Sequence, residues 1–176
     1  IQDTARTLSR YCDAILYRTF RQEEVEDLAK YATVPVINGM TDFSHPCQVL
    51  GDLMTLREKH PLLEGLKLCC VGDGNNMCSS PIGGCLKVGM RVAVACPQGY
   101  EPPQVILDFA AGYPGMFALC HDPREAVQGA DVVYTDVWTS MGMDDQREIR
   151  EQVFSGIYQV NADLLALAKP GCMVQH

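Results

Sequence analysis

Apolar positions follow two alternating spacings along the chain. Short runs in which nearly every residue is apolar, such as LKLCCV and RVAVA, alternate with stretches that carry an apolar residue every three or four positions. The first spacing is typical of buried strands and the second of amphipathic helices. Their alternation predicts a parallel α/β sheet with helical crossovers. No internal repeat or low-complexity tract interrupts the pattern.

The first 64 residues are predicted to form three helices and two short strands. Asp3 or Thr4 is the expected cap of the first helix, Asn38-Gly39 should close the second strand, and Pro46 suits the first turn of the third helix. The charged stretch that follows this helix is a plausible domain junction. We expect helices over 3–10, 22–32 and 46–59, and strands over 14–17 and 35–37.

The remaining residues are predicted to form five strands joined by helical crossovers, which makes a doubly wound sheet. Such sheets bind ligands at the carboxyl ends of their strands. Pro81 falls inside one predicted helix, where it would cost about 3 kcal/mol unless that helix starts late or kinks. We expect strands over 66–71, 91–95, 116–119, 131–135 and 172–175, and helices over 76–88, 103–111, 123–127, 145–154 and 161–168.

Composition narrows the function classes. The formal net charge of -8 argues against a general nucleic-acid binder, which needs a positive surface. No apolar run reaches about 18 residues, so we expect no membrane span. The nine cysteines show no CxxC spacing. We expect buried, reduced thiols, which suit a cytosolic or organellar interior.

Two candidate groups precede the second sheet. Arg18 ends the strand AILY, where an arginine can bind a carboxylate or phosphate through two parallel bonds. In HPCQ, His45 could polarise a carbonyl and Gln48, one turn later, could bond an amide. The alternatives are an ordinary ion pair for Arg18, a loop residue resembling a helix cap for His45, and a solvated helix residue for Gln48.

Two further segments follow strands of the second sheet. In DVWTSMG, Asp136 could hold an ammonium group, and Ser140 with the next amide could hold a carboxylate, which suits an α-amino acid. A turn with a buried tryptophan is the alternative. GDGNN resembles a nucleotide-binding turn, but Met77 stands where G-x-G-x-x-G needs its third glycine. A tight turn without a ligand is the other interpretation.

Taken together and in order, these segments resemble the ornithine carbamoyltransferases. HPxQ is shared across carbamoyltransferases, whereas DVWxSMG points to ornithine rather than aspartate. The resemblance covers nearly the whole chain: DTARTLSRYCDAIL, RTF, VPVINGMTD, HPCQVLGDLMTL, LKLCCVGDGNN, GYEP, DPREAVQGADVVYTDVWTSMG and YQVNADLLALAKP.

The resemblance implies a fold and an activity. It implies carbamoyl transfer from carbamoyl phosphate to the δ-amino group of L-ornithine, giving L-citrulline and phosphate, in a homotrimer without cofactor or metal. Its expected location is the cytoplasm, or the mitochondrial matrix in a eukaryote. Residues 1–44 would be the remnant of an incomplete carbamoyl-phosphate-binding α/β domain, 45–64 an interdomain helix and junction, and 65–176 a doubly wound ornithine-binding domain.

The resemblance also implies roles for particular residues. Arg18, His45 and Gln48 would be catalytic, stabilising charge on the carbonyl oxygen and the leaving phosphate. The residues implied for carbamoyl phosphate are Arg18, His45, Pro46, Cys47 and Gln48, and those for ornithine are Asn76, Asp136, Ser140 and Met141.

The chain also departs from the family pattern. It has no Ser-Thr-Arg-Thr phosphate loop, and its last residue, His176, matches only the start of the family's His-Cys-Leu-Pro segment. We therefore expect an internal piece that is weakly active or inactive alone and that tends to associate through exposed sheet edges. Two alternatives are a non-catalytic amino-acid-binding or interaction fragment, and a nucleotide-dependent oxidoreductase domain, which the glycine pattern disfavours.

Overall fold

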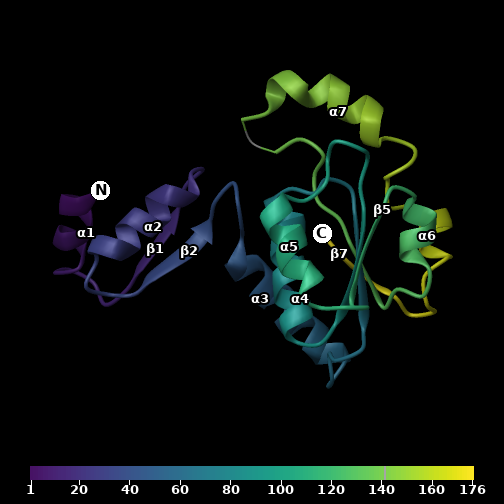
Figure 1. The fold of residues 1–176 in the computed structure, drawn as a ribbon, viewed down its shortest axis with the longest axis horizontal. Coiled ribbons are helices and arrows are strands. Elements are labelled where there is room, and N and C mark those ends of the chain that lie inside the picture. The colour runs from purple at the N-terminus through teal and green to yellow at the C-terminus, as the bar shows by residue number, and fades with distance from the viewer. Residues whose placement is uncertain (141) are drawn as a thin grey trace.

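The structure is a computed structural model that describes residues 1–140 and 142–176. A small N-terminal part lies on one side of helix α3 and a larger five-stranded part on the other (Figure 1). The N-terminal part pairs two parallel strands and packs two helices on them around Ala5, Ile15 and Leu28. Its elements are α1 (Gln2–Leu8), β1 (Ile15–Arg18), α2 (Gln22–Tyr31) and β2 (Val36–Met40).

The larger part is a parallel sheet in the order β5-β4-β3-β6-β7, which confirms the predicted α/β class with doubly wound topology. Helices cover both faces (Figure 1). The strands are β3 (Lys67–Val71), β4 (Arg91–Ala95), β5 (Phe117–Cys120), β6 (Val132–Tyr134) and β7 (Met173–Gln175). The helices are α3 (Pro46–Lys59), α4 (Asn76–Lys87), α5 (Gln104–Ala111), α6 (Pro123–Val127), the 3₁₀ helix η1 (Asp144–Gln146), α7 (Arg147–Phe154) and α8 (Ala162–Leu165).

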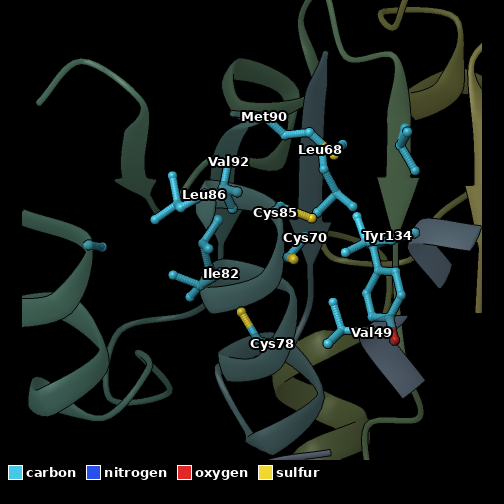
Figure 2. Close-up of a cluster of buried hydrophobic side chains, with 14 of the residues drawn as sticks. Val49, Leu68, Cys70, Cys78, Ile82, Cys85, Leu86, Met90, Val92 and Tyr134 are labelled. Carbon is cyan, nitrogen blue, oxygen red and sulfur yellow. The ribbon is translucent and has the colours of Figure 1, made fainter. Parts of the chain in front are cut away.

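Alternate residues along the strands of the larger sheet point to opposite faces and pack into two separate hydrophobic cores. Leu68, Cys70 and Val92 pack against α3, α4 and α5, and Figure 2 shows them beside Cys78 and Cys85 of α4. The intervening residues of the same strands pack against α6, Phe154 and Leu164 on the opposite face. All nine cysteines are free and five are buried, which agrees with the expected role of cysteine as a small apolar residue.

Every predicted helix and strand is present, and most have shifted ends, whereas α3, β4 and α6 have the predicted bounds. Neither Asp3 nor Thr4 caps the first helix, because α1 already begins at Gln2 and has no side-chain cap. The helix predicted over 145–154 is divided into η1 and α7, and the one after Asn161 ends at Leu165. Pro81 lies inside α4, which nevertheless starts at Asn76 as predicted.

The clearest correction concerns Asn38-Gly39, which lies inside β2 instead of closing it. Tyr17 pairs with Asn38 and Arg18 with Met40, so Gly39 is an extra residue opposite a register shift. A Cβ at Gly39 would lie 2.9 Å from Leu16 Cδ2 and 3.2 Å from the Tyr17 carbonyl oxygen. The glycine therefore permits a bulge, and bulges commonly change the direction in which a neighbouring side chain points.

Among the described residues, no helix combines the length and the apolar character that crossing a membrane requires.

Candidate functional site

A cavity of about 350 Å³ lies where the N-terminal part meets the carboxyl ends of β3 and β6. This volume is at the lower end of the roughly 300–1,000 Å³ usual for small-molecule sites. Six side chains predicted from sequence line it together: Arg18, His45, Gln48, Asn76, Asp136 and Ser140. The remaining lining residues are Phe20, Met40, Thr41, Asp42, Asn75, Met77, Val137 and Met143.

Arg18 is placed by the bulge between β1 and β2 and is exposed at the cavity. It makes no ion pair with any residue that the structure describes, so the alternative of an ordinary ion pair finds no partner there. A guanidinium without a carboxylate partner, at the edge of a cavity, can bind a phosphate or a carbonyl oxygen.

His45 is both a helix cap and a cavity residue. Its Nδ1 accepts a hydrogen bond from the Gln48 backbone N–H at 3.3 Å, at the N-terminus of the 14-residue helix α3. An Nδ1 that accepts carries no proton, so the neutral ring carries its proton on Nε2. Burial lowers the pKa of His45, and the charge of Arg18 lowers it further, while Asp52 and Asp136 act in the opposite direction. The site therefore offers a neutral imidazole donor at neutral pH.

We expect the imidazole of His45 to titrate below about 6.5, the ordinary value for histidine. Protonation then favours the unfolded chain, so the stability that His45 contributes is present above pH 6.5 and is lost as the pH falls through its lowered pKa. Arg18→Gln should raise this pKa because it removes a nearby positive charge. Proton NMR of the ring C–H signals, assigned with His45→Gln, measures both values. A pKa at or above 6.5 in the unmodified chain would contradict the assignment.

The N-terminus of α4 faces the same cavity and is tied to the N-terminal part. The Asn75 side chain caps α4 by accepting from the amides of Met77 (2.9 Å) and Cys78 (3.3 Å). Asn76 Nδ2 donates to the Thr41 carbonyl oxygen at 2.6 Å, which leaves its Oδ1 for a ligand. Ser80 Oγ accepts from the His45 backbone N–H at 2.7 Å. Two helix N-termini, each partly positive, thus converge on the cavity and favour an anion.

Asp136 and Ser140 lie on the loop that leaves β6. This loop is anchored at its start by Thr135, whose hydroxyl donates to the Val71 carbonyl oxygen at 3.0 Å. Further along, the buried Arg150 donates to the Trp138 carbonyl oxygen and pairs with Asp73. The loop therefore holds the carboxylate of Asp136 and the hydroxyl of Ser140 at the cavity in a fixed arrangement. The alternative interpretation of this segment is a turn with a buried tryptophan, but Trp138 is only half-buried.

Two predicted site residues are not among the cavity residues, and a third cannot be placed. Pro46 and Cys47 do not line the cavity, and the Cys47 thiol donates instead to the Asn38 carbonyl oxygen at 3.3 Å. Met141 lies outside the described residues. Their assignment to substrate binding stays a prediction.

Sequence reasoning missed the groups that act behind the cavity wall. Asp52, which bonds the Gln48 side chain, and Arg150, which holds the 136–140 loop, do not line the cavity. The spacing of four residues between Gln48 and Asp52 on one helix was a usable signal. No local spacing indicates the pairing of Asp73 with Arg150, because the two residues are 77 positions apart in the sequence. Among the described residues, no three His, Cys, Asp or Glu side chains could hold a metal ion.

Comparison with known proteins gives one consistent result. Residues 1–58 match the carbamoyl-P binding domain of aspartate/ornithine carbamoyltransferase, and residues 64–176 match its Asp/Orn binding domain. Ornithine carbamoyltransferase of Geobacter metallireducens is 49% identical over 177 residues, and the anabolic enzyme of Pyrococcus furiosus is 52% identical over 180. The alignments include the whole of this chain but only 58% and 57% of those proteins.

The structural comparison agrees. The solved structure of ornithine carbamoyltransferase from Pyrococcus furiosus superimposes with a TM-score of 0.92 at 52% identity, covering 98% of this chain and 56% of that one. The chain thus spans somewhat more than half the length of the relatives it matches.

Proposed function

The chain belongs to the aspartate/ornithine carbamoyltransferase family, and from this premise we propose that its cavity binds carbamoyl phosphate and L-ornithine. The whole protein then transfers the carbamoyl group to the δ-amino nitrogen. One observation carries the proposal: Arg18, His45 and Gln48 line the same cavity as Asp136 and Ser140. The first three suit a carbonyl and a phosphate, and the last two suit an α-amino acid.

The carbamoyl phosphate side is built from donors. Arg18 and the Nε2–H of neutral His45 can donate to the carbonyl oxygen, where negative charge develops as the nitrogen attacks. The N-termini of α3 and α4 and the charge of Arg18 favour the phosphate. The reaction forms a bond from carbon to the δ-nitrogen and breaks the bond from carbon to the bridging oxygen. The proton lost from nitrogen leaves with the phosphate.

The ornithine side combines acceptors with one donor. Asp136 and Asn76 Oδ1, which line the same cavity, can receive the α-ammonium group, and Ser140 can donate to the α-carboxylate. Fixing these two groups leaves the side chain free to reach the carbonyl carbon. This contribution is mainly one of orientation, which can supply about 7–11 kcal/mol of a two-substrate barrier.

The test is binding and turnover by the 176-residue chain beside Asp136→Ala. We expect calorimetry to show ornithine binding that falls at least about tenfold in the variant, because the charged partner of the ammonium is lost. Carbamoyl phosphate binding should change little. Citrulline formation should be weak, and what there is should disappear with Asp136. Ornithine binding unaffected by Asp136→Ala would contradict the site assignment.

An amino-acid-binding fragment without catalysis is the second candidate. The test uses a longer chain that also spans the part of the relatives' length not covered here. This candidate is favoured if that longer chain binds ornithine but forms no citrulline. The nucleotide alternative has less support. The Gly74 backbone packs against Tyr100, Glu101 and Pro102, which occupy the position where a pyrophosphate would approach a nucleotide-binding glycine.

We further propose a homotrimer in the cytoplasm. Family membership supports the trimer, and nine free thiols suit a reducing compartment.

A further inference from the structure

We propose that Asp52 is a positioning residue that fixes the Gln48 carboxamide with its oxygen toward the cavity, so that the site selects a carbamoyl group over an acetyl group. The inference rests on the proposed function, because it concerns the same cavity. It adds a residue that lies outside the lining and assigns it a role in substrate selection.

The contact that carries the inference is a single hydrogen bond. Gln48 Nε2 donates to Asp52 Oδ1 at 2.9 Å, one helical turn further along α3. A carboxylate oxygen only accepts, so the nitrogen of the carboxamide must face Asp52. If the amide were turned over, Gln48 Oε1 would meet Asp52 Oδ1 and two acceptors would face each other. The bond therefore decides which end of the carboxamide faces the cavity.

Asp52 itself is held from several directions. Its backbone carbonyl oxygen accepts from Gln175 Nε2 of β7 at 3.2 Å. Its Oδ2 and the Tyr134 hydroxyl are both buried, and neither has a hydrogen-bond partner among the described residues. Tyr134 packs in the same core as Val49 of α3, as Figure 2 shows. Burial raises the pKa of Asp52, and Gln48 and Tyr134 lower it. Ionised Asp52 only accepts, and neutral Asp52 with its proton on Oδ2 still accepts through Oδ1, so both forms keep the bond from Gln48 Nε2.

The fixed carboxamide completes a pattern of donors and acceptors. Arg18 and His45 Nε2–H present donors to the cavity, and Gln48 Oε1 then presents an acceptor. A carbamoyl group has one acceptor oxygen and one NH₂ donor and matches this pattern. An acetyl group has the same shape, but its methyl group leaves Gln48 Oε1 without a partner. Losing a hydrogen bond in this way corresponds to roughly a tenfold to hundredfold loss of affinity.

The experiment compares carbamoyl phosphate with acetyl phosphate as ligands of this chain, by calorimetry or competition NMR. We expect the unmodified chain to prefer carbamoyl phosphate by at least about tenfold. In Asp52→Asn the side chain can present either a donor or an acceptor to Gln48, so the preference should fall below about threefold. The loss should come from weaker carbamoyl phosphate binding, with acetyl phosphate binding unchanged.

Controls separate positioning from stability. Glu58→Gln makes the same charge change at an exposed position of α3 and should keep the full preference. Leucine is close to aspartate in shape and has no polar side-chain atom. Asp52→Leu therefore replaces Asp52→Asn if the latter variant does not fold. Gln48→Ala should abolish the preference by itself, and adding Asp52→Asn to it should change nothing more. Such non-additivity identifies a residue that acts through Gln48.

Three outcomes would overturn the inference while leaving the proposed carbamoyl phosphate site in place. One is equal affinity of the unmodified chain for the two phosphates. Another is a full preference retained in both Asp52 variants. The third is an equal loss of both ligands in Asp52→Asn, which would indicate a general structural role. If neither phosphate binds the folded, unmodified chain, the proposed carbamoyl phosphate site fails first and the inference fails with it.

Discussion

Arg150→Met is expected to lower the free energy of unfolding by about 3–5 kcal/mol. Arg150 is 6% exposed and pairs with Asp73, so its removal leaves a carboxylate buried without its partner. Its guanidinium also lies 5.1 Å from the Tyr100 ring centroid and 5.5 Å from that of Phe154. Arg150 and Phe154 are the buried residues of α7, so the loss also loosens that helix. Urea unfolding followed by circular dichroism measures the change.

The pH dependence of this variant has a definite sign. Burial raises the pKa of Asp73, and Arg150 works against that rise. Without Arg150 the folded-state pKa moves further above the unfolded value of about 3.9. A group with a raised folded pKa favours the folded state at low pH, and this contribution is lost as the pH rises through that pKa. The deficit of Arg150→Met should therefore be larger at pH 7 than near pH 5.

Two comparisons make the result specific. Arg147→Met removes an exposed arginine three residues earlier, which is 4.0 Å from the exposed Asp144, and should change stability by less than about 0.5 kcal/mol. Adding Asp73→Asn to Arg150→Met should recover part of the loss, because no carboxylate is then left buried. A loss below about 1 kcal/mol in Arg150→Met, or a deficit that grows toward pH 5, would show that the pair does not stabilise the fold as argued.

Gly74→Ala is expected to destabilise the chain by about 3 kcal/mol or more, at or above the usual range for overpacking. An added Cβ would lie 2.4 Å from the Pro102 nitrogen, and 2.5 Å from both the Glu101 carbonyl carbon and the Tyr100 carbonyl oxygen. These are backbone atoms, so no side-chain rotation relieves the clash. The Gly74 amide also donates to the Tyr100 carbonyl oxygen at 2.8 Å, and separating the segments would strain that bond.

Gly83→Ala is the matched control, because a Cβ at Gly83 within α4 would meet no atom within 4 Å. That change should stabilise the chain by about 0.5–1 kcal/mol through the higher helix propensity of alanine. Thermal unfolding of both variants should thus shift in opposite directions. Similar midpoints would contradict the packing drawn around Gly74, and a destabilised Gly83→Ala would contradict the open space beside α4.

Local patterns predicted the elements and most of the polar side chains that line the cavity. The runs LKLCCV and RVAVA form the inner strands β3 and β4, because such continuous apolar runs suit strands that are buried on both faces of a parallel sheet. Arg18 and Asp136 could be selected because they follow such runs, and carboxyl ends of strands gather at one edge. His45 could be selected because Pro46 marks a helix start. The interpretation of Asn38-Gly39 failed because the sequence does not show that β1 passes close enough to require a glycine there.

The sequence by itself determined the α/β class, the position of most elements and six of the residues that line the cavity. The class, the elements and five of these residues follow from period, breakers and strand ends, which act over a few residues, whereas Asn76 was implied by the family resemblance. The tertiary structure decided which polar groups support the site: Asp73 with Arg150, Asn76 with Thr41, and Tyr134 beside Asp52. Such partners are brought together by sheet order and crossover geometry, so no local spacing encodes them. The groups that hold the cavity-lining residues in place are therefore known only once the chain is folded.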